Sequence, residues 1–193
     1  MSSIIKVNEI QDGGGNTIIK TDGSGDVTNS IVGVNECSQF YCNAEQTISS
    51  GNTPTTITGN WSSISNASTS YEAIGTEPTE SSGVWTLPRT GKYIISGAVE
   101  LKNTATTNSR YAQAIVQTTT DNSTYNNTMY STNNFGSETA NQFVFCNFQT
   151  FFDCTDTSTH KIRLQAAAAV AVNVGGNSTQ IRTNIMFMRI GDT

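Results

Sequence analysis

Residues 91–101 read GKYIISGAVEL, and this stretch decides the fold. Side chains on a β-strand point alternately to its two faces, so a half-buried strand carries an apolar residue at every second position. Here the buried face is predicted to hold Tyr93, Ile95, Val99 and Leu101. Polar residues lie among the intervening positions and face water. The segment therefore predicts one strand of an antiparallel sheet that has one buried face and one solvent-exposed face.

Two later segments, residues 143–152 and 183–190, are apolar on both faces. The first places Phe143, Phe145 and Phe151 opposite Val144, Cys146, Phe148 and Phe152, and the second places Ile185 and Phe187 opposite Met186, Met188 and Ile190. An antiparallel strand that is apolar on both faces is covered on both. One face meets the core of the domain, so the other is predicted to meet another subunit. The predicted subunit interface consists of Phe143, Phe145, Phe151, Ile185 and Phe187, with the opposite faces of the two strands as the alternative.

The rest of the chain also favours strands over helices. Residues 111–120 are rich in β-formers, and residues 161–165 alternate again. The alanine-rich block 166–171 could form a helix, but valines follow it at every second position up to Val174, which favours a tightly packed strand. We predict an all-β protein, a sandwich of two antiparallel sheets.

Composition limits the possible partners. Ser, Thr and Asn make up 71 of the 193 residues, 13% are charged, and the formal net charge is −5. Negative charge repels phosphate backbones and anionic headgroups, so neither nucleic acid nor a membrane is an expected partner. Hydrophobic residues account for only 35% of the chain, so the core of a single subunit is expected to be small. Apolar surface buried between subunits would add to its stability. The N-terminus lacks the basic-then-apolar pattern of a secretory signal, so we expect folding in a cytoplasm.

The first 30 residues differ from the remainder. Short apolar runs flank the glycine-rich turn at 12–16, and a second turn follows at 22–26, a pattern typical of small β-hairpins. A lone hairpin of this size is unstable in water and needs a surface to lie against. We predict an anchoring segment, residues 1–35, ahead of a domain at 36–193. The expected docking residues are Ile4, Ile5, Val7, Ile10, Ile18 and Ile19.

No enzyme active site, cofactor or metal centre is predicted. Nucleophilic catalysis normally needs a histidine base, and the single histidine, His160, follows a polar loop where we expect it to be solvated. No pair of carboxylates stands out as a glycosidase site. The Asp22–Asp26 turn could hold Ca²⁺, but it lacks the later bidentate glutamate, so a bare turn is preferred.

The four cysteines are expected to be small buried residues on strands. Their spacings match no zinc pattern, and cytoplasmic folding argues against structural disulfides. A bridge formed after release from the cell is the alternative, for instance between Cys37 and Cys42.

The stretch 122–138 is predicted to be rich in loops. Loops on a rigid sandwich are common places for recognition, and exposed aromatic side chains can bind glycans. The candidate receptor contacts are Tyr125, Tyr130 and Phe135, and local packing is the alternative for them.

Residues 85–97, WTLPRTGKYIISG, resemble the central signature of the complement C-one-q and tumour-necrosis-factor-like jelly roll. Weaker matches follow in the family's order at Phe40-Tyr41, 143–153 and 183–191, so the resemblance spans residues 36–193. It implies a homotrimeric jelly roll with about ten strands in two sheets. In that family the sixth and last strands lie in the inner sheet around the threefold axis, and these match the two segments that are apolar on both faces.

The front of the chain is similar instead to N-terminal segments of marine-phage fibre and virion proteins. The similarity lies in IIKVNEIQ at 4–11, followed by a glycine-rich turn and DGSG at 22–25. The ending MFMRIGD at 186–192 is also like that group. This resemblance implies a virion protein made in the host cytoplasm. The front of the chain also departs from the C-one-q-like family, whose animal members carry signals, collagen repeats or membrane anchors that are not expected here.

Together these features predict a bacteriophage structural protein: a tail fibre, head fibre, decoration or adaptor protein. Its expected partners are two further copies of itself, other virion proteins of the capsid, tail or baseplate, and a host surface glycan or protein. A secreted C-one-q-like ligand-binding module and a capsule polysaccharide depolymerase are the alternatives.

Overall fold

The computed structural model describes residues 9–15, 17–20, 34–64, 72–104, 106, 111–136 and 141–193, with only the backbone at 17–20. The chain divides into two compact units, Met1–Asn35 and Glu36–Thr193. The described part of the chain contains no helix that is long and apolar enough to cross a membrane.

The first unit contains a hairpin of β1 (Glu9–Gln11) and β2 (Thr17–Lys20), which pair antiparallel with Ile10 opposite Ile19. The Asp12 carboxylate accepts the Gly14 N–H at 2.8 Å and closes the turn. The predicted first hairpin is therefore confirmed. Ile10 is exposed. Ile4, Ile5, Val7, the side chains of Ile18 and Ile19, and the turn at 22–26 lie outside the described residues.

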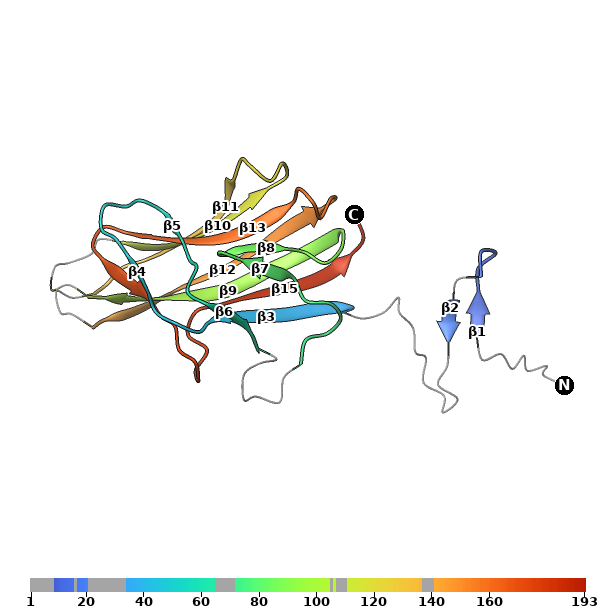
Figure 1. Cartoon of the computed structure of the whole chain (residues 1–193), viewed down its shortest axis with the longest axis horizontal. Coiled ribbons are helices and arrows are strands. Elements are labelled where there is room, and N and C mark those ends of the chain that lie inside the picture. Colours follow the sequence, from blue (N-terminus) through green and yellow to red (C-terminus); the bar gives the residue numbers. More distant parts are fainter. Residues whose placement is uncertain are drawn as a thin grey trace. The chain divides into compact units, whose positions relative to one another are not determined.

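The second unit is a sandwich of two antiparallel sheets, as predicted (Figure 1). The six-stranded sheet has the order β11 (Asn126–Asn133), β10 (Ala112–Thr119), β13 (Lys161–Ala168), β8 (Val84–Thr86) and β7 (Thr79–Ser81), and β5 (Thr55–Thr56) also pairs with β13. The seven-stranded sheet has the order β4 (Gln46–Ile48), β14 (Val172–Val174), β9 (Gly91–Asn103), β15 (Asn184–Gly191), β3 (Glu36–Cys42) and β6 (Trp61–Ser63), and β12 (Phe143–Cys154) pairs with β9. The first three residues of the alanine-rich block, 166–168, complete β13, and β14 begins at Val172, so the strand interpretation is confirmed there, whereas residues 169–171 connect the two strands.

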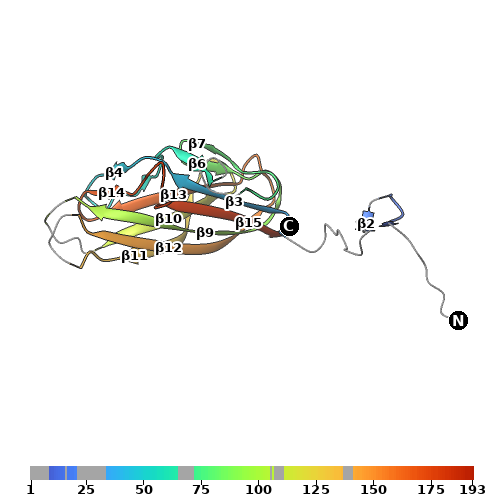
Figure 2. The ribbon, with the colours of Figure 1, turned by 90° about the horizontal axis from the view of Figure 1, so that it is seen from below.

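The two long edges of the sandwich differ. Figure 2 shows the seven-stranded sheet with β12 along one edge and β6 near the other. The short strands β6 and β7 end their respective sheets on the same side, while β11 and β12 lie on the opposite side.

An aromatic cluster joins the two sheets. The Phe187 ring on β15 packs against Trp85 on β8 at a centroid distance of 5.7 Å and against Phe40 on β3 at 6.2 Å. Trp85 and Ile185 are fully buried, and Phe187 is 2% exposed. The assignment of Ile185 and Phe187 to the subunit interface is therefore wrong, because a single subunit already encloses both side chains.

The 85–97 signature fixes the entry to β9. Tyr93 is buried, and its hydroxyl lies 2.9 Å from a carboxylate oxygen of Glu36, which also forms an ion pair with Arg89 in the preceding turn. Gly91 has a φ of 146°, and a Cβ there would lie 2.6 Å from the Gly191 carbonyl oxygen. Glycine is therefore required at this point, where the first residue of β9 meets the end of β15.

All four cysteines are buried and free, which confirms the expectation of small core residues. Burial raises the pKa of the Cys146 thiol to about 11 and raises that of Cys42 further. Thiolates are the reactive form, so these side chains should be inert in the folded protein.

We expect a thiol-specific disulfide reagent to label none of the four cysteines rapidly in native buffer and all four in denaturant. Native-state mass spectrometry after a timed exposure measures the labelling. Fast labelling of Cys42 or Cys146 under native conditions would contradict the enclosed core.

Candidate functional site

The outer face of the seven-stranded sheet carries apolar side chains at both ends and polar ones between them. Antiparallel pairing sets Phe151 on β12 beside Ile94 on β9, and Ile94 beside Met188 on β15. Two further rows cross β12, β9 and β15 in the same way, toward the start of β12. The first row is Gln149, Ser96 and Met186, and the second is Asn147, Ala98 and Asn184. Neighbours of this kind are close enough to form one continuous surface.

The first apolar group, here called the start cluster, consists of Phe143, Phe145 and Ile181. The two phenylalanines are each 47% exposed, and Ile181 is 39% exposed. Together with Glu100 and Arg182 they line a hollow of about 500 Å³.

Charges next to the start cluster fix one of its rings. The Lys102 ammonium lies 5.7 Å from the centre of the Phe143 ring, and the Arg182 guanidinium carbon lies 6.0 Å from it. Arg182 also forms an ion pair at 3.0 Å with Glu100, whose carboxylate is almost completely buried. Cation–π and ionic contacts therefore orient the ring before any partner arrives.

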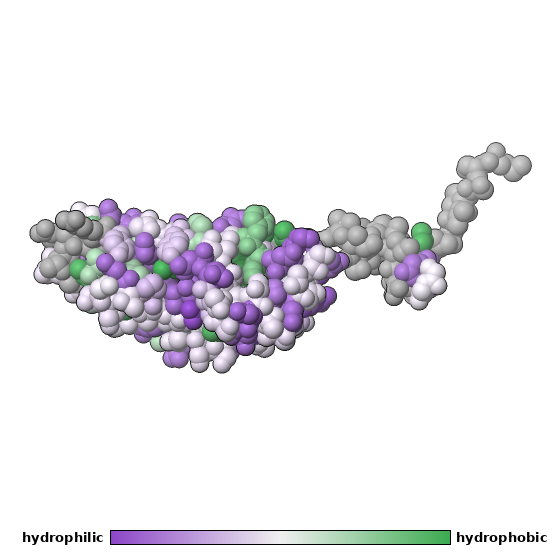
Figure 3. Space-filling view, turned by 90° about the horizontal axis from the view of Figure 1, so that it is seen from above, coloured by the Kyte–Doolittle hydropathy of each residue, from purple (hydrophilic) through white to green (hydrophobic). Residues whose placement is uncertain are grey.

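The second group, the end cluster, consists of Ile94, Phe151, Met188 and Ile190. Phe151 is 67% exposed and Ile190 is 50% exposed, which is high for such large apolar side chains. Phe151, Phe152 and Ile190 line an apolar hollow of about 450 Å³ between Lys92 and Asp153. Figure 3 looks onto the opposite side of the sandwich, that of the six-stranded sheet, where much of the surface has hydrophilic or neutral colour and hydrophobic colour gathers mainly in one strip.

The strand that carries most of these rings is also a sheet edge. Within the described part of the chain, β12 pairs with β9 alone along its 12 residues. A long apolar edge strand presents unpaired backbone N–H and C=O groups and an apolar surface that another chain can pair with. Soluble proteins usually block such edges. The exposed Phe143, Phe145 and Phe151 agree with the predicted surface, whose use as a subunit contact stays a prediction.

Comparison with solved structures identifies the architecture. The structure of Eiger TNF from S. frugiperda superposes with a TM-score of 0.60 at 11% identity, over 81% of this chain and 93% of that one. Murine APRIL superposes with a TM-score of 0.55 at 10% identity, over 80% of this chain and 98% of that one. The fold is a tumour-necrosis-factor-like jelly roll. No family model matches the sequence, and no curated protein matches it.

The candidate receptor residues do not form one exposed group on this jelly roll. Phe135 is 3% exposed and belongs to the core, so its assignment as a receptor contact is wrong. The Arg163 guanidinium stacks 3.8 Å above the Tyr125 ring, and burial raises the pKa of Tyr125. Tyr130 is exposed, but it lies on β11, because residues 126–133 of the predicted loop form a strand.

A tight turn joins β10 to β11 in front of Tyr125. The Asp121 carboxylate accepts the N–H of Thr124 at 2.7 Å, the N–H of Ser123 at 2.9 Å and the Thr119 hydroxyl at 2.7 Å. These donors hold the pKa of Asp121 well below its usual range. A lowered carboxyl pKa stabilises the fold above the unfolded value of about 4 and stops doing so as the pH falls through the folded pKa.

We therefore expect Asp121 to stay ionised in acid where an ordinary aspartate is half protonated. A carbon NMR titration of the side-chain carboxyl measures the midpoint, and Thr119→Val should raise it by removing one donor. A midpoint near the ordinary value in the unmodified protein would contradict the observed turn.

His160 is buried, so the expectation of a solvated loop residue is wrong. Its two ring nitrogens each lie 3.1 Å from a hydroxyl, those of Thr155 and Thr159, and its ring lies 5.8 Å from Phe152. Both nitrogens already have partners, so the residue has a structural role in the turn before β13. Among the described residues, no group of three or more His, Cys, Asp or Glu side chains is arranged to hold a metal ion.

Proposed function

We propose that this protein is a structural component of a bacteriophage particle that assembles as a homotrimer and acts without catalysis. In this proposal the outer face of the seven-stranded sheet forms the subunit contact. The first 35 residues dock on other virion proteins of the capsid, tail or baseplate. The jelly roll is displayed for assembly or attachment to the host surface.

One observation carries the trimer proposal: Phe143, Phe145 and Phe151 are all exposed on one face of a single edge strand. Exposed apolar patches of this kind on soluble proteins mark interaction surfaces. The polar stripe through Asn147 and Gln149 separates the two clusters, and such a stripe can fix the register of a partner by hydrogen bonding.

Support for the virion role comes from the front of the chain. The IIKVNEIQ segment is similar to N-terminal segments of phage fibre proteins, and the hairpin of β1 and β2 belongs to a compact unit, Met1–Asn35, that is separate from the jelly roll.

Light scattering coupled to size exclusion tests the oligomer. We expect three times the mass of one chain at micromolar concentration. A single-chain mass would reject the trimer and leave the virion role to be tested separately.

Intact particles test the virion role. A small gold-binding tag after Thr193 should appear at a fixed place on the particle in electron micrographs. Deletion of residues 1–35 should leave a soluble trimer that no longer joins particles. Incorporation of the truncated protein would show that the anchor assignment is wrong.

A secreted ligand module is the second candidate, favoured by the likeness to Eiger TNF and murine APRIL. In this candidate the protein is also a homotrimer, but it is not part of a virus particle. Recovery of the protein from culture medium, with none on purified particles, would favour it over the virion role.

A further inference from the structure

A second surface feature lies at the opposite edge of the sandwich from β12. Residues of the segment before β6, of β6 itself and of the β7–β8 turn surround a hollow of about 560 Å³. Its lining consists of Thr58, Asn60, Trp61, Ser62, Glu80 and Ser82. This volume is within the range of sites that hold small molecules.

The indole of Trp61 forms a fixed platform in this hollow. Its ring nitrogen donates to the Ile57 carbonyl oxygen at 2.8 Å, and its ring meets that of Trp85 edge-on at a centroid distance of 4.8 Å. Trp61 remains only partly buried, whereas Trp85 is fully enclosed. The platform is therefore held from inside the protein and still reaches solvent.

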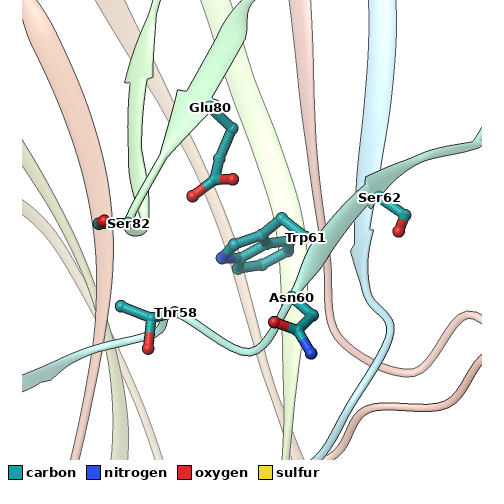
Figure 4. A pocket seen from close by; sticks show the side chains of 6 residues that line it. All are labelled: Thr58, Asn60, Trp61, Ser62, Glu80 and Ser82. Atoms are coloured by element: carbon teal, nitrogen blue, oxygen red, sulfur yellow. The ribbon is translucent and has the colours of Figure 1, made fainter.

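Polar groups surround the platform. Figure 4 shows the Glu80 carboxylate directed toward the indole from β7, with Thr58 and Asn60 on the other side of the ring. One Glu80 oxygen accepts the Gly83 N–H. Within the described residues, the other Glu80 oxygen and the side chains of Asn60, Ser62 and Ser82 make no hydrogen bond, so donors and acceptors remain available to a ligand.

The backbone holds two of these polar residues in an unusual conformation. Asn60 has a φ of 52° and Ser82 a φ of 53°, in the left-handed region that L-residues adopt at a cost. Beside Ser82, a Cβ on Gly83 would lie 2.5 Å from the Ile57 carbonyl oxygen, so this turn fits closely against the segment that leads to Trp61. Conformations of this kind collect at functional sites.

We propose that this hollow binds a neutral pyranose sugar. An aromatic face with adjacent amide, carboxylate and hydroxyl groups matches a sugar ring, which presents C–H groups on its faces and hydroxyls around its rim. The Glu80 carboxylate and the formal net charge of −5 disfavour anionic sugars. The site goes beyond the proposed structural role and does not depend on it, because one subunit supplies every lining residue.

The test uses the full-length protein and methyl glycosides of glucose, galactose, mannose and N-acetylglucosamine, one at a time. Saturation-transfer NMR detects contact, and tryptophan fluorescence reports on the hollow, because Trp61 is the partly exposed one of the two tryptophans. We expect at least one glycoside to saturate with a dissociation constant on the order of 1 mM, typical of a small exposed site. Methyl sialoside should bind far more weakly.

Two variants separate binding from folding. Glu80→Gln keeps an acceptor for the Gly83 N–H but loses the charge, and Asn60→Gly removes the amide at a position where glycine tolerates the positive φ. Each should weaken binding about tenfold without changing the thermal midpoint by much, the usual effect of losing one charged or buried hydrogen bond. Asn126→Ala, which removes an exposed amide from β11 at the opposite edge of the sandwich, is the control and should bind as the unmodified protein does. The proposal is overturned if no neutral glycoside saturates the protein at a ligand concentration of about ten times the expected dissociation constant. It is also overturned if both hollow variants bind as tightly as the control.

Discussion

Replacing Phe145 and Phe151 together by threonine is expected to convert the assembled protein into single subunits. Each ring is about half exposed or more, so burial in a trimer would remove roughly 100 Å² of apolar surface per ring, worth on the order of 2 kcal/mol. The double change removes six such rings from a trimer, so the association should weaken by on the order of 10 kcal/mol. Threonine suits an exposed strand position, so β12 itself should still form.

Light scattering measures the outcome directly. Tyr130→Thr is the matched control, because it removes an exposed aromatic side chain from β11 in the other sheet. The control should keep the mass of the unmodified protein. A double variant that keeps the trimer mass would show that the exposed phenylalanines serve another purpose.

Phe187→Ala is expected to lower the free energy of unfolding by about 3–5 kcal/mol. The ring joins the sheets through Trp85 and Phe40, and the residue is 2% exposed, so its removal leaves a cavity that the rigid strands cannot close. Urea denaturation should be followed in the Phe145→Thr, Phe151→Thr background, where unfolding does not depend on subunit association.

Met188→Ala tests the opposite face of the same strand. Met188 is half-buried on the outer surface beside Ile94, so its truncation should cost less than half of what Phe187→Ala costs in the single subunit. In the assembled protein it should instead reduce association. Equal costs for the two changes would contradict the assignment of the two faces.

Much of the architecture could be predicted from alternating hydrophobicity. Tyr93, Ile95, Val99 and Leu101 all face the core, as the pattern of β9 requires. The outward rings of β12 could also be predicted, because Cys146, Phe148 and Phe152 alternate along one face. That alternation leaves Phe143, Phe145 and Phe151 on the other face, where they are exposed.

The same reasoning failed for β15 because a period of two does not say which face is inside. Ile185 and Phe187 lie on one face of the strand and Met186 and Met188 on the other. Both pairs are large and apolar, so hydrophobicity alone does not show which pair is buried. Pairing decides the outcome: Ile185 lies beside Gly97 and Phe40, both on the inner face, so the set of Ile185 and Phe187 is enclosed. Such a choice depends on register between strands that are far apart in the chain.

The tryptophan hollow could not be predicted because its two walls come from different sheets. Residues 58–62 and 80–82 meet only where β6 and β7 end their sheets on one side. A partial signal was present, since one of only two tryptophans sits between Asn60 and Ser62 in an otherwise polar stretch. The burial of His160 and Phe135 likewise depends on neighbours that the local pattern does not reveal.

The placement of β12 and the tryptophan hollow at opposite edges has a consequence for attachment. If both proposals hold, each trimer presents three identical hollows at fixed spacing, none of them used up by assembly. Three binding sites of low individual affinity then act together, because once the first sugar is bound the other two sites bind at a high effective local concentration of sugar. Adhesion of this kind rises steeply with the density of sugars on a cell and stays reversible where they are sparse.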